Sequence, residues 1–285
     1  MFKALLRLII LVLFMLLSVS EAAAMEVSFF EEFPHEKTLE KIAQIDFDTR
    51  IYVAAKNLSQ FYEYEDQFKA QNPQIKQVIY WPVLEKEEGY WISPWSDSAA
   101  LERVFEEIKD RKDKKKQEVL LDLEPSLQRS RLLGFKDFRK NKEQIEEFVA
   151  NAKEYNISLS TVEKSYIPEG ILEYFDLSFN PEEFGNQKIK MYYSSYRRKL
   201  WPDFVVDKLF ERKVSRYAEK GIKLGLGLIA PGIHNEAHYI SPETLQTEVK
   251  IASDYGIQEV IIFRLEGLNE EYLKVLEKFV LNYSK

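Results

Sequence analysis

The sequence predicts an α/β protein that folds as a single (β/α)8 TIM barrel preceded by a signal peptide. Short apolar segments rich in β-branched and aromatic residues alternate with charged amphipathic segments throughout residues 25–285. The apolar segments begin roughly every 25–40 residues, which is the span of one strand–helix unit. No linker, internal repeat or low-complexity tract divides the chain, so we expect one barrel domain at 25–285 after a signal peptide at 1–24.

Eight of the apolar segments have the length and composition of buried strands. A ninth segment, Phe175–Phe179, has a similar composition, and we assign it to an irregular connection after the fifth strand. The main alternative fold is a doubly wound open sheet, which is disfavoured because no glycine-rich phosphate loop follows the first strand. The eight predicted strands are Glu26–Phe30, Arg50–Ala54, Gln77–Trp81, Glu118–Glu124, Ile157–Val162, Ile189–Ser194, Ile222–Ile229 and Glu259–Glu266.

The segments between the strands carry helix signals. Apolar residues recur at helical spacing in residues 101–108 and 145–152. Ser241 followed by Pro242 is an N-cap with proline at the first helical position, and Asn269 is placed to cap the last helix. We therefore expect helices between successive strands, as a (β/α)8 barrel requires.

The composition excludes several classes of site. With 47 acidic and 40 basic residues the net charge is −7, so we expect no nucleic-acid partner, because phosphate binding needs a basic surface. The lack of cysteine excludes disulfides, zinc–thiolate sites and a cysteine nucleophile. His234, Glu236 and His238 have a spacing that could bind a metal, but they follow Pro231 and Gly232 in a predicted loop, so we expect neither a metal nor a cofactor.

The first 24 residues have the layout of a secretory signal peptide. The basic residues Lys3 and Arg7 precede the apolar run Leu8–Leu17, and the small residues Ala22–Ala24 form a cleavage site. The run is shorter than the roughly 20 residues that span a bilayer, so we expect cleavage after Ala24 and no stable membrane span. The protein is then secreted or extracytoplasmic, with an uncleaved membrane anchor as the alternative. No single-face apolar stripe marks a subunit interface, so we expect a monomer.

Asp122 and Glu124 are the sharpest candidates for catalysis. Active sites of (β/α)8 barrels lie at the carboxyl ends of the strands, and these residues end the fourth strand two positions apart, so they face the same side. Two close carboxylates drive their pKa values apart, which leaves one as a proton donor and the other charged, as glycoside cleavage requires. The alternative is a structural pair bonded to Arg264 or another basic residue at a strand end.

Aromatic residues after the third strand favour a carbohydrate ligand. Trp81, Trp91 and Trp95 fall within fifteen residues and are interleaved with Tyr80 and Tyr90. Sugar rings present apolar C–H faces that stack on such side chains, and these side chains lose little entropy on binding. A lid that packs over the mouth of the barrel is the alternative.

Other strand ends supply further candidates. The first strand ends in Glu31 and Glu32, followed by His35, and the seventh is followed by His234. We expect Glu266 and Tyr193 to act with Asp122 and Glu124 in catalysis. The residues expected to bind substrate are Glu31, Tyr80, Trp81, Trp91, Trp95, Glu163, Tyr192 and Arg264.

The later strands resemble those of chitinase-like enzymes of glycoside hydrolase family 18. That family carries the motif D-x-x-D-x-D-x-E on strand four and M-x-Y-D on strand six. The resemblance covers about half of the chain and supports a general relation to barrel glycosidases. It rests, in order and spacing, on Glu118–Glu124, Met191-Tyr192-Tyr193, Leu224–Gly227 and Val260–Glu266.

The resemblance implies a role for three residues. Glu124 would be the general acid, Asp122 would orient the N-acetyl group whose oxygen serves as nucleophile, and Tyr193 would assist that group. The chain departs from the family where carboxylates and a tryptophan are expected. The departures are Gln117 and Leu120 for two aspartates, Ser194 for the strand-six aspartate, and Phe263 or Arg264 for the strand-eight tryptophan.

Two functions from different classes follow. The first is an exported glycoside hydrolase that cleaves a polysaccharide, with N-acetylated sugars as one option. A direct displacement by Glu124 with Glu266 or Glu163 is the alternative mechanism, with carboxyls about 5 Å apart for retention and about 6.5–9.5 Å for inversion. The second is a non-catalytic glycan-binding barrel, which the missing carboxylates at Leu120 and Ser194 favour. An unrelated barrel hydrolase or lyase is a third option.

Overall fold

The computed structural model describes residues 25–111, 116–126, 137–235 and 238–280. The expected signal peptide and its cleavage site lie outside these residues. Within the described ranges, no helix is both long and apolar enough to cross a membrane.

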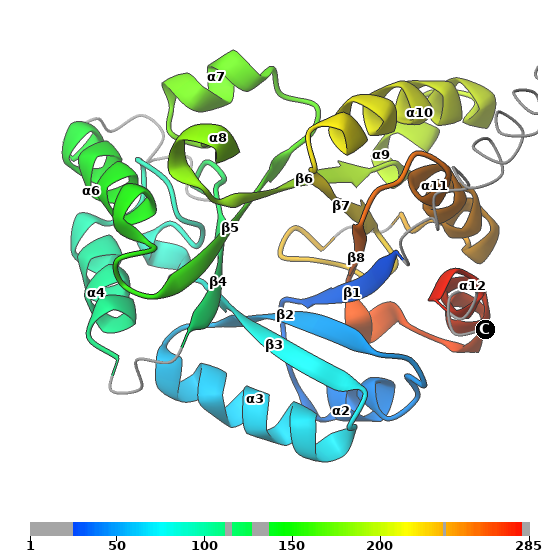
Figure 1. The fold of residues 1–285 in the computed structure, drawn as a ribbon, viewed down its shortest axis with the longest axis horizontal. Helices are drawn as coiled ribbons and strands as arrows, with labels where there is room; N and C mark the ends of the chain where they lie inside the picture. Colours follow the sequence, from blue (N-terminus) through cyan, green and yellow to red (C-terminus); the bar gives the residue numbers. More distant parts are fainter. Residues whose placement is uncertain (1–24, 112–115, 127–136, 236–237, 281–285) are drawn as a thin grey trace, which may run out of the picture.

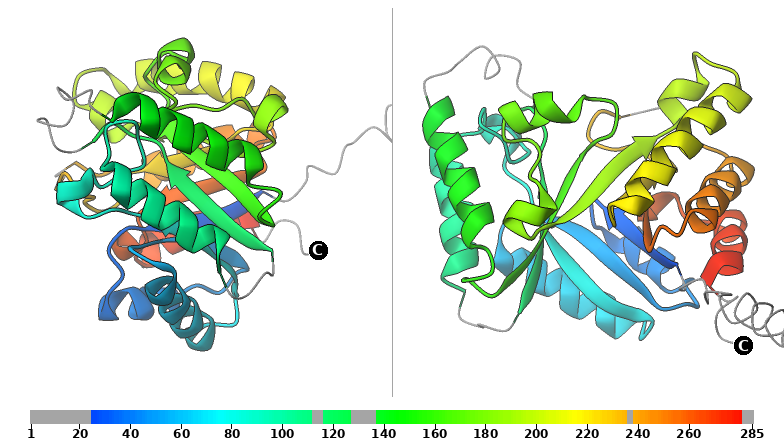
Figure 2. Two further views of the ribbon diagram at one scale, coloured as in Figure 1. Left: turned by 90° about the vertical axis from the view of Figure 1, so that its left-hand side faces the viewer. Right: turned by 45° about the horizontal axis from the view of Figure 1, so that its top comes forward.

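Eight parallel strands close into a barrel (Figure 1), and helices surround it in the two further views (Figure 2). Each strand pairs with its neighbour in the sequence, and β1 pairs with β8 from Glu26↔Glu259 to Phe30↔Phe263, which closes the ring. The predicted (β/α)8 barrel is therefore confirmed. The strands are β1 Glu26–Glu31, β2 Thr49–Ala55, β3 Ile75–Pro82, β4 Gln117–Asp122, β5 Ile157–Lys164, β6 Gln187–Tyr193, β7 Lys223–Gly227 and β8 Glu259–Phe263.

Four strands, β4, β6, β7 and β8, end one to three residues earlier than the sequence predicts, and the ends of β4 and β8 bear on the site. β4 ends at Asp122, so Glu124 lies in the loop that follows. The N–H of Leu123 still donates to the carbonyl of Val162 at 3.1 Å, which keeps this loop against β5. β8 ends at Phe263, because the chain turns into a short 3-10 helix directly afterwards.

The segment Phe175–Phe179 is part of a connection, as predicted. The N–H of Phe175 donates to the carbonyl of Ile171, and that of Leu177 donates to the carbonyl of Leu172. These bonds turn the segment back on the preceding helix, so its backbone does not add a ninth strand to the sheet.

The helices form the outer layer, and two of them begin at the capping residues found in the sequence, Ser241 and Asn269, whose side chains accept hydrogen bonds from backbone N–H groups. The side chain of Asp97 caps another helix by accepting from two backbone N–H groups. The helices are α2 Glu36–Ile42, α3 Leu58–Gln71, α4 Ser98–Lys109, α6 Phe138–Asn151, α7 Glu169–Tyr174, α8 Pro181–Phe184, α9 Ser195–Arg198, α10 Asp203–Glu219, α11 Pro242–Asp254 and α12 Glu270–Val280, with 3-10 helices η1 Lys86–Glu88 and η2 Leu265–Gly267.

The core consists of two shells, because successive residues of a strand point to opposite sides. One shell lies between the strands and the helices, and the other fills the interior of the barrel. The position of a residue along its strand therefore decides whether it faces the helices or the interior. Residues of the interior shell include Phe30, Tyr52, Ile79, Trp81, Leu120, Val162, Ile189, Met191, Ile261 and Phe263.

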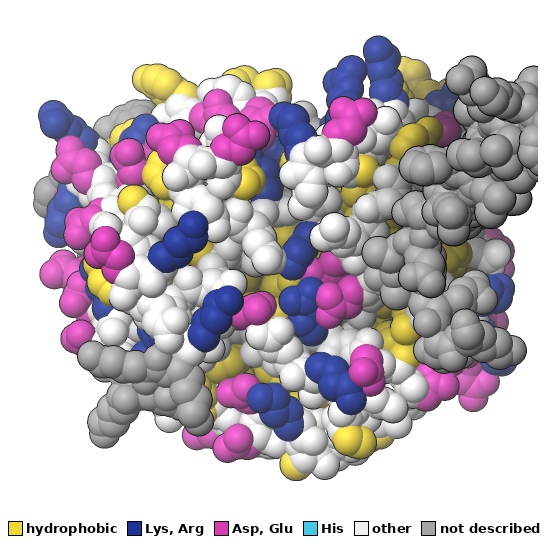
Figure 3. Space-filling model, in the orientation of Figure 1, with side chains coloured by type: hydrophobic (Ala, Val, Ile, Leu, Met, Phe, Trp, Pro, Cys, Tyr) yellow, Lys and Arg dark blue, Asp and Glu magenta, His cyan; other side chains and the backbone are white. Residues whose placement is uncertain are grey.

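The face of the molecule seen in Figure 3 carries charges of both signs. Lys and Arg side chains are interspersed with Asp and Glu side chains over this face. Such a surface is well solvated and, on this face, forms no continuous basic field.

A buried carboxylate joins four strands at the amino end of the barrel. Glu259 begins β8, and only 1% of its surface is exposed. It accepts hydrogen bonds from Ser28 at 2.7 Å and Tyr52 at 3.1 Å. It also forms ion pairs with Arg50 at 2.8 Å and Lys223 at 2.7 Å. These partners come from β1, β2 and β7, so Glu259 links the strands on both sides of the closure.

We expect Glu259→Gln to lower the free energy of unfolding by about 3 kcal/mol, because Arg50 and Lys223 lose a buried counter-charge. Urea denaturation of residues 25–285, followed by circular dichroism, measures this change. Lys250→Gln is the control, because it removes only an exposed ion pair with Asp254 and is expected to cost less than about 0.5 kcal/mol. Equal effects of the two substitutions would contradict the role of Glu259.

Candidate functional site

A cavity of about 410 Å³ opens at the carboxyl ends of the strands. Active sites of (β/α)8 enzymes lie at this end, and the volume is typical of a small-molecule site. Strand ends and the loops that follow them form its wall. Charged residues in the wall include Glu32, Asp122, Glu124, Lys164 and Arg197, and aromatic residues include Trp81, Trp91, Tyr193 and Phe263.

Asp122 and Glu124 lie together in this cavity, as the sequence predicts. Both are buried, and their carboxyl groups are hydrogen-bonded to each other. Lys164, the last residue of β5, forms an ion pair with Glu124. The ammonium of Lys164 also lies 5.4 Å from the centre of the Trp91 ring. The basic partner of the carboxyl pair is therefore Lys164, which is the other basic residue at a strand end that the sequence left open, and not Arg264.

The surroundings favour a proton on the Asp122 carboxyl group. Burial raises the pKa of Asp122 well above its ordinary value, the charge of Glu124 raises it further, and Lys164 opposes the rise only in part. Burial also disfavours the charged form of Lys164, but Glu124 outweighs this effect, so the pKa of Lys164 is raised. The surroundings therefore favour the protonated form of Asp122 and the charged form of Lys164.

Several buried polar atoms of cavity-lining residues form no hydrogen bond with any described residue. Among them are Oδ1 of Asp122, Nε1 of Trp81 and the phenol oxygen of Tyr193. Burial, with added repulsion from Asp122 and Glu124, raises the pKa of Tyr193 well above its ordinary value, so its phenol stays protonated. The wall thus presents two donors and a carboxyl oxygen to a ligand with hydroxyl or amide groups.

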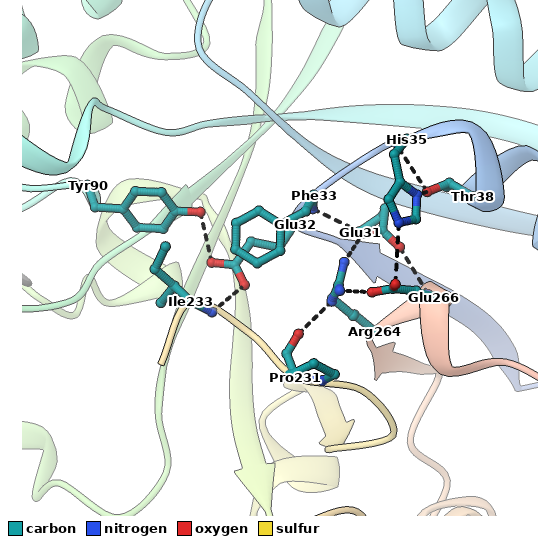
Figure 4. Close-up of polar contacts among 10 residues, drawn as sticks. All are labelled: Glu31, Glu32, Phe33, His35, Thr38, Tyr90, Pro231, Ile233, Arg264 and Glu266. Carbon is teal, nitrogen blue, oxygen red and sulfur yellow. Dashed lines mark hydrogen bonds and ion pairs between the residues drawn. The ribbon is translucent and has the colours of Figure 1, made fainter. Parts of the chain in front are cut away.

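Glu32 is a third carboxyl group of the cavity, which the sequence placed at the end of the first strand but not among the expected catalytic or substrate-binding residues. Its carboxylate accepts hydrogen bonds from the Tyr90 hydroxyl at 2.8 Å and from the Ile233 N–H at 3.1 Å (Figure 4). Burial raises its pKa to about 7, against the opposing effect of these hydrogen bonds. Its position could have revealed it, because Glu32 lies two residues after Phe30 and so continues the inward-facing side of β1.

Glu31, Arg264 and Glu266 form a separate cluster at the seam between β1 and β8, and none of them lines the cavity. Arg264 donates to Glu31 at 2.6 Å and to the carbonyl of Pro231 at 2.7 Å. Glu266 forms an ion pair with Arg264 and lies 3.3 Å from His35. Figure 4 shows this cluster beside the Glu32 contacts. The charged groups of this cluster are paired with one another and lie away from the cavity.

Tyr80, Glu163 and Tyr192 occupy outward-facing strand positions. The Tyr80 ring packs on Phe61, and the Tyr192 ring packs on Phe210 while touching the rim of the cavity. Their alternation with inward-facing neighbours explains these positions. Glu163 is fully buried and lies 3.2 Å from Lys188 and 3.1 Å from Lys190, on the side of the helices.

The three tryptophans of the predicted sugar site separate into two groups. Trp81 and Trp91 line the cavity, and the indole of Trp91 lies 5.5 Å from the His234 ring. Trp95 packs between Phe138 and Phe175 and does not line the cavity.

The histidines provide no metal site in the part of the chain that the structure describes. No group of three or more His, Asp or Glu side chains there is arranged to hold a metal ion. His234 lies at the cavity and His238 is described, whereas Glu236 lies outside the described residues.

No protein-family model matches the chain, and no curated protein matches it. Its structure is similar to those of TIM-barrel glycoside hydrolases. A GH5-4 endoglucanase from Clostridium acetobutylicum matches with a TM-score of 0.54 and 11% identity, over 88% of this chain and 96% of the other. The catalytic domain of a β-amylase from Paenibacillus polymyxa matches with a TM-score of 0.55 and 9% identity, over 92% and 99%.

A spore cortex-lytic enzyme from Bacillus megaterium has a TM-score of 0.53 and 11% identity, over 90% of this chain and 74% of the other. Identities of this size establish a shared fold. The chemistry of the site must therefore be argued from its own residues.

The pKa of Glu32 predicts a pH-dependent stability. Because the folded protein raises this pKa from 4.5 to about 7, it binds the proton more tightly than the unfolded chain. The resulting stabilisation is complete below about pH 4.5 and is lost as the pH rises through 7. Between pH 5 and pH 8 we expect the wild type to lose about 2–3 kcal/mol of unfolding free energy relative to Glu32→Gln.

Urea unfolding at the two pH values tests this difference. Glu143→Gln, at an exposed helix position, is the matched control and is expected to follow the wild type. If the unfolding free energy of Glu32→Gln changed with pH as the wild type's does, the raised pKa of Glu32 would be ruled out.

Proposed function

We propose that the protein is an exported glycoside hydrolase that cleaves a polysaccharide, with Glu124 as the general acid. The observation that carries the proposal is the hydrogen-bonded pair Asp122–Glu124, buried in a cavity with aromatic walls at the carboxyl end of a (β/α)8 barrel. The pair holds a proton and a negative charge side by side, which are the two groups that glycoside cleavage uses.

The reaction follows from this arrangement. As the bond between the anomeric carbon and the glycosidic oxygen breaks, Glu124 delivers the proton of the pair to that oxygen. The carboxylates that remain stabilise the positive charge that develops on the sugar. Water then adds its oxygen to the anomeric carbon, and its released proton returns to the pair, so the site is restored.

The polar atoms without partners support a sugar with an N-acetyl group. The Tyr193 hydroxyl can donate to the acetamide carbonyl, and Oδ1 of Asp122 can accept from the acetamide N–H. These are the roles that the resemblance to family 18 implies for the two residues. Trp81 and Trp91 provide the apolar surfaces on which sugar rings stack.

Export and subunit state are further parts of the proposal. The layout of residues 1–24 supports a cleaved signal peptide, which delivers the barrel outside the cytoplasm, and an uncleaved anchor is the alternative. We propose a monomer, because no single-face apolar stripe in the sequence marks a subunit interface.

Hydrolysis of a panel of soluble oligosaccharides by residues 25–285 tests the function. The panel includes N-acetylglucosamine oligomers, and released reducing ends are measured. We expect Glu124→Gln to lower turnover by about 100-fold or more, because the proton donor is lost. Glu266→Gln is expected to have little effect, because Glu266 lies outside the cavity.

Circular dichroism verifies that each variant folds. Turnover that survives Glu124→Gln would remove Glu124 as the acid. Binding of a glycan without any turnover would instead favour the non-catalytic barrel, a function with which the ion pair between Lys164 and Glu124 is also consistent.

A further inference from the structure

The charges of the cavity are distributed unevenly. Carboxyl groups come from the residue after β1 and from the end of β4 and the loop after it, at Glu32, Asp122 and Glu124. Cationic groups come from the neighbouring β5 and from α9, at Lys164 and Arg197. A neutral sugar needs hydrogen-bonding groups and aromatic surfaces but no ammonium group in the cavity wall. Recognition of a neutral sugar therefore does not account for Lys164 in the wall.

The negative charge of the site is smaller than the number of carboxyl groups implies. Asp122 is buried beside Glu124, which favours its protonated form, and the pKa of Glu32 is raised to about 7, so Glu32 is only partly charged at neutral pH. Lys164 and Glu124 balance each other. Arg197 faces the Tyr192 ring at 5.2 Å and forms no ion pair with any described residue. The cavity therefore has an excess of positive charge that an anionic ligand would neutralise.

We propose that Lys164 selects a glycan that carries a carboxylate and exchanges its ion pair with Glu124 for one with the substrate. This inference rests on the proposed glycosidase function and names its substrate class. Lys164 is accessible for the exchange, because it lines the cavity with 24% of its side chain exposed and its ammonium lies over Trp91. A carboxylate fits because the ammonium already holds one, so the exchange replaces a charge pair with an equivalent pair.

The exchange would also prepare the acid. While Lys164 is paired with Glu124, the ammonium stabilises the negative charge of that carboxylate. When the substrate carboxylate takes over Lys164, Glu124 loses its counter-ion beside a protonated Asp122. The proton can then move along the hydrogen bond from Asp122 to Glu124, which donates it to the glycosidic oxygen. A neutral glycan would leave Glu124 in its ion pair.

The carboxylate could come from a uronic acid ring or from a substituent of an amino sugar, and the test separates these sources. Isothermal titration calorimetry of residues 25–285 compares tetragalacturonate and an N-acetylmuramic-acid-containing tetrasaccharide with the neutral cellotetraose and tetra-N-acetylchitotetraose. We expect one acidic oligomer to bind at least about tenfold more tightly than its neutral counterpart, with an affinity that falls as salt rises.

Substitutions assign the preference to one residue. We expect Lys164→Gln to weaken binding of the acidic oligomer by about tenfold or more and so to abolish its preference over the neutral one, and circular dichroism verifies that the variant folds. Lys164→Arg should restore much of the preference. Lys199→Gln is the matched control, since it removes one positive charge at an exposed position after α9.

Two results would overturn the inference. One is equal or weaker binding of both acidic oligomers compared with the neutral ones, including no binding of either acid. The other is an unchanged preference in Lys164→Gln. The failure of the proposed function is distinct, because it is read from turnover: acidic oligomers that bind through Lys164 but are never cleaved would refute hydrolysis and leave the charge preference intact.

Discussion

Closure of the sheet between β1 and β8 is the constraint on which the site depends. It aligns the first and last strands from Glu26↔Glu259 to Phe30↔Phe263 and brings Glu32 into one cavity with Asp122 and Glu124, which follow it by about ninety residues in the chain. Both ends of this seam contain buried charges. Glu259 links four strands at the amino end, and the contact between Glu31 and Arg264 lies at the carboxyl end. Closure also removes both edges of the sheet, so its backbone groups are satisfied internally.

The closed barrel creates the chemistry by excluding water. Carboxyl groups in solution would all be charged at neutral pH, whereas burial raises the pKa of Asp122 well above its ordinary value and that of Glu32 to about 7. The same exclusion strengthens the attraction between Lys164 and Glu124. Protonation, charge and aromatic surface are therefore combined within one cavity, a combination that suits a polar substrate with apolar ring faces.

Much of the fold and part of the site could be predicted from the sequence. All eight strands lie where the apolar segments predict them, and Asp122, Glu124, Trp81, Trp91 and Tyr193 line one cavity. Tyr80 and Glu163 were expected to bind substrate but face the helices, whereas Lys164 and Glu32 face the cavity and were not among the expected site residues. These wrong predictions of side-chain direction have one physical origin. Strands of a parallel barrel are buried on both faces, so their composition does not show which alternate residues point inward.

The sequence by itself determined the order of strands and helices, the closed barrel and the end of it at which a site forms, because these follow from local periodicity, capping and the handedness of βαβ units. The tertiary structure alone decided the direction of each side chain and its partners. It paired Glu124 with Lys164, and it placed Arg264 with Glu31 and Glu266. Those pairings depend on the stagger between neighbouring strands and on the loops that pack over them, and both are set only when the barrel closes.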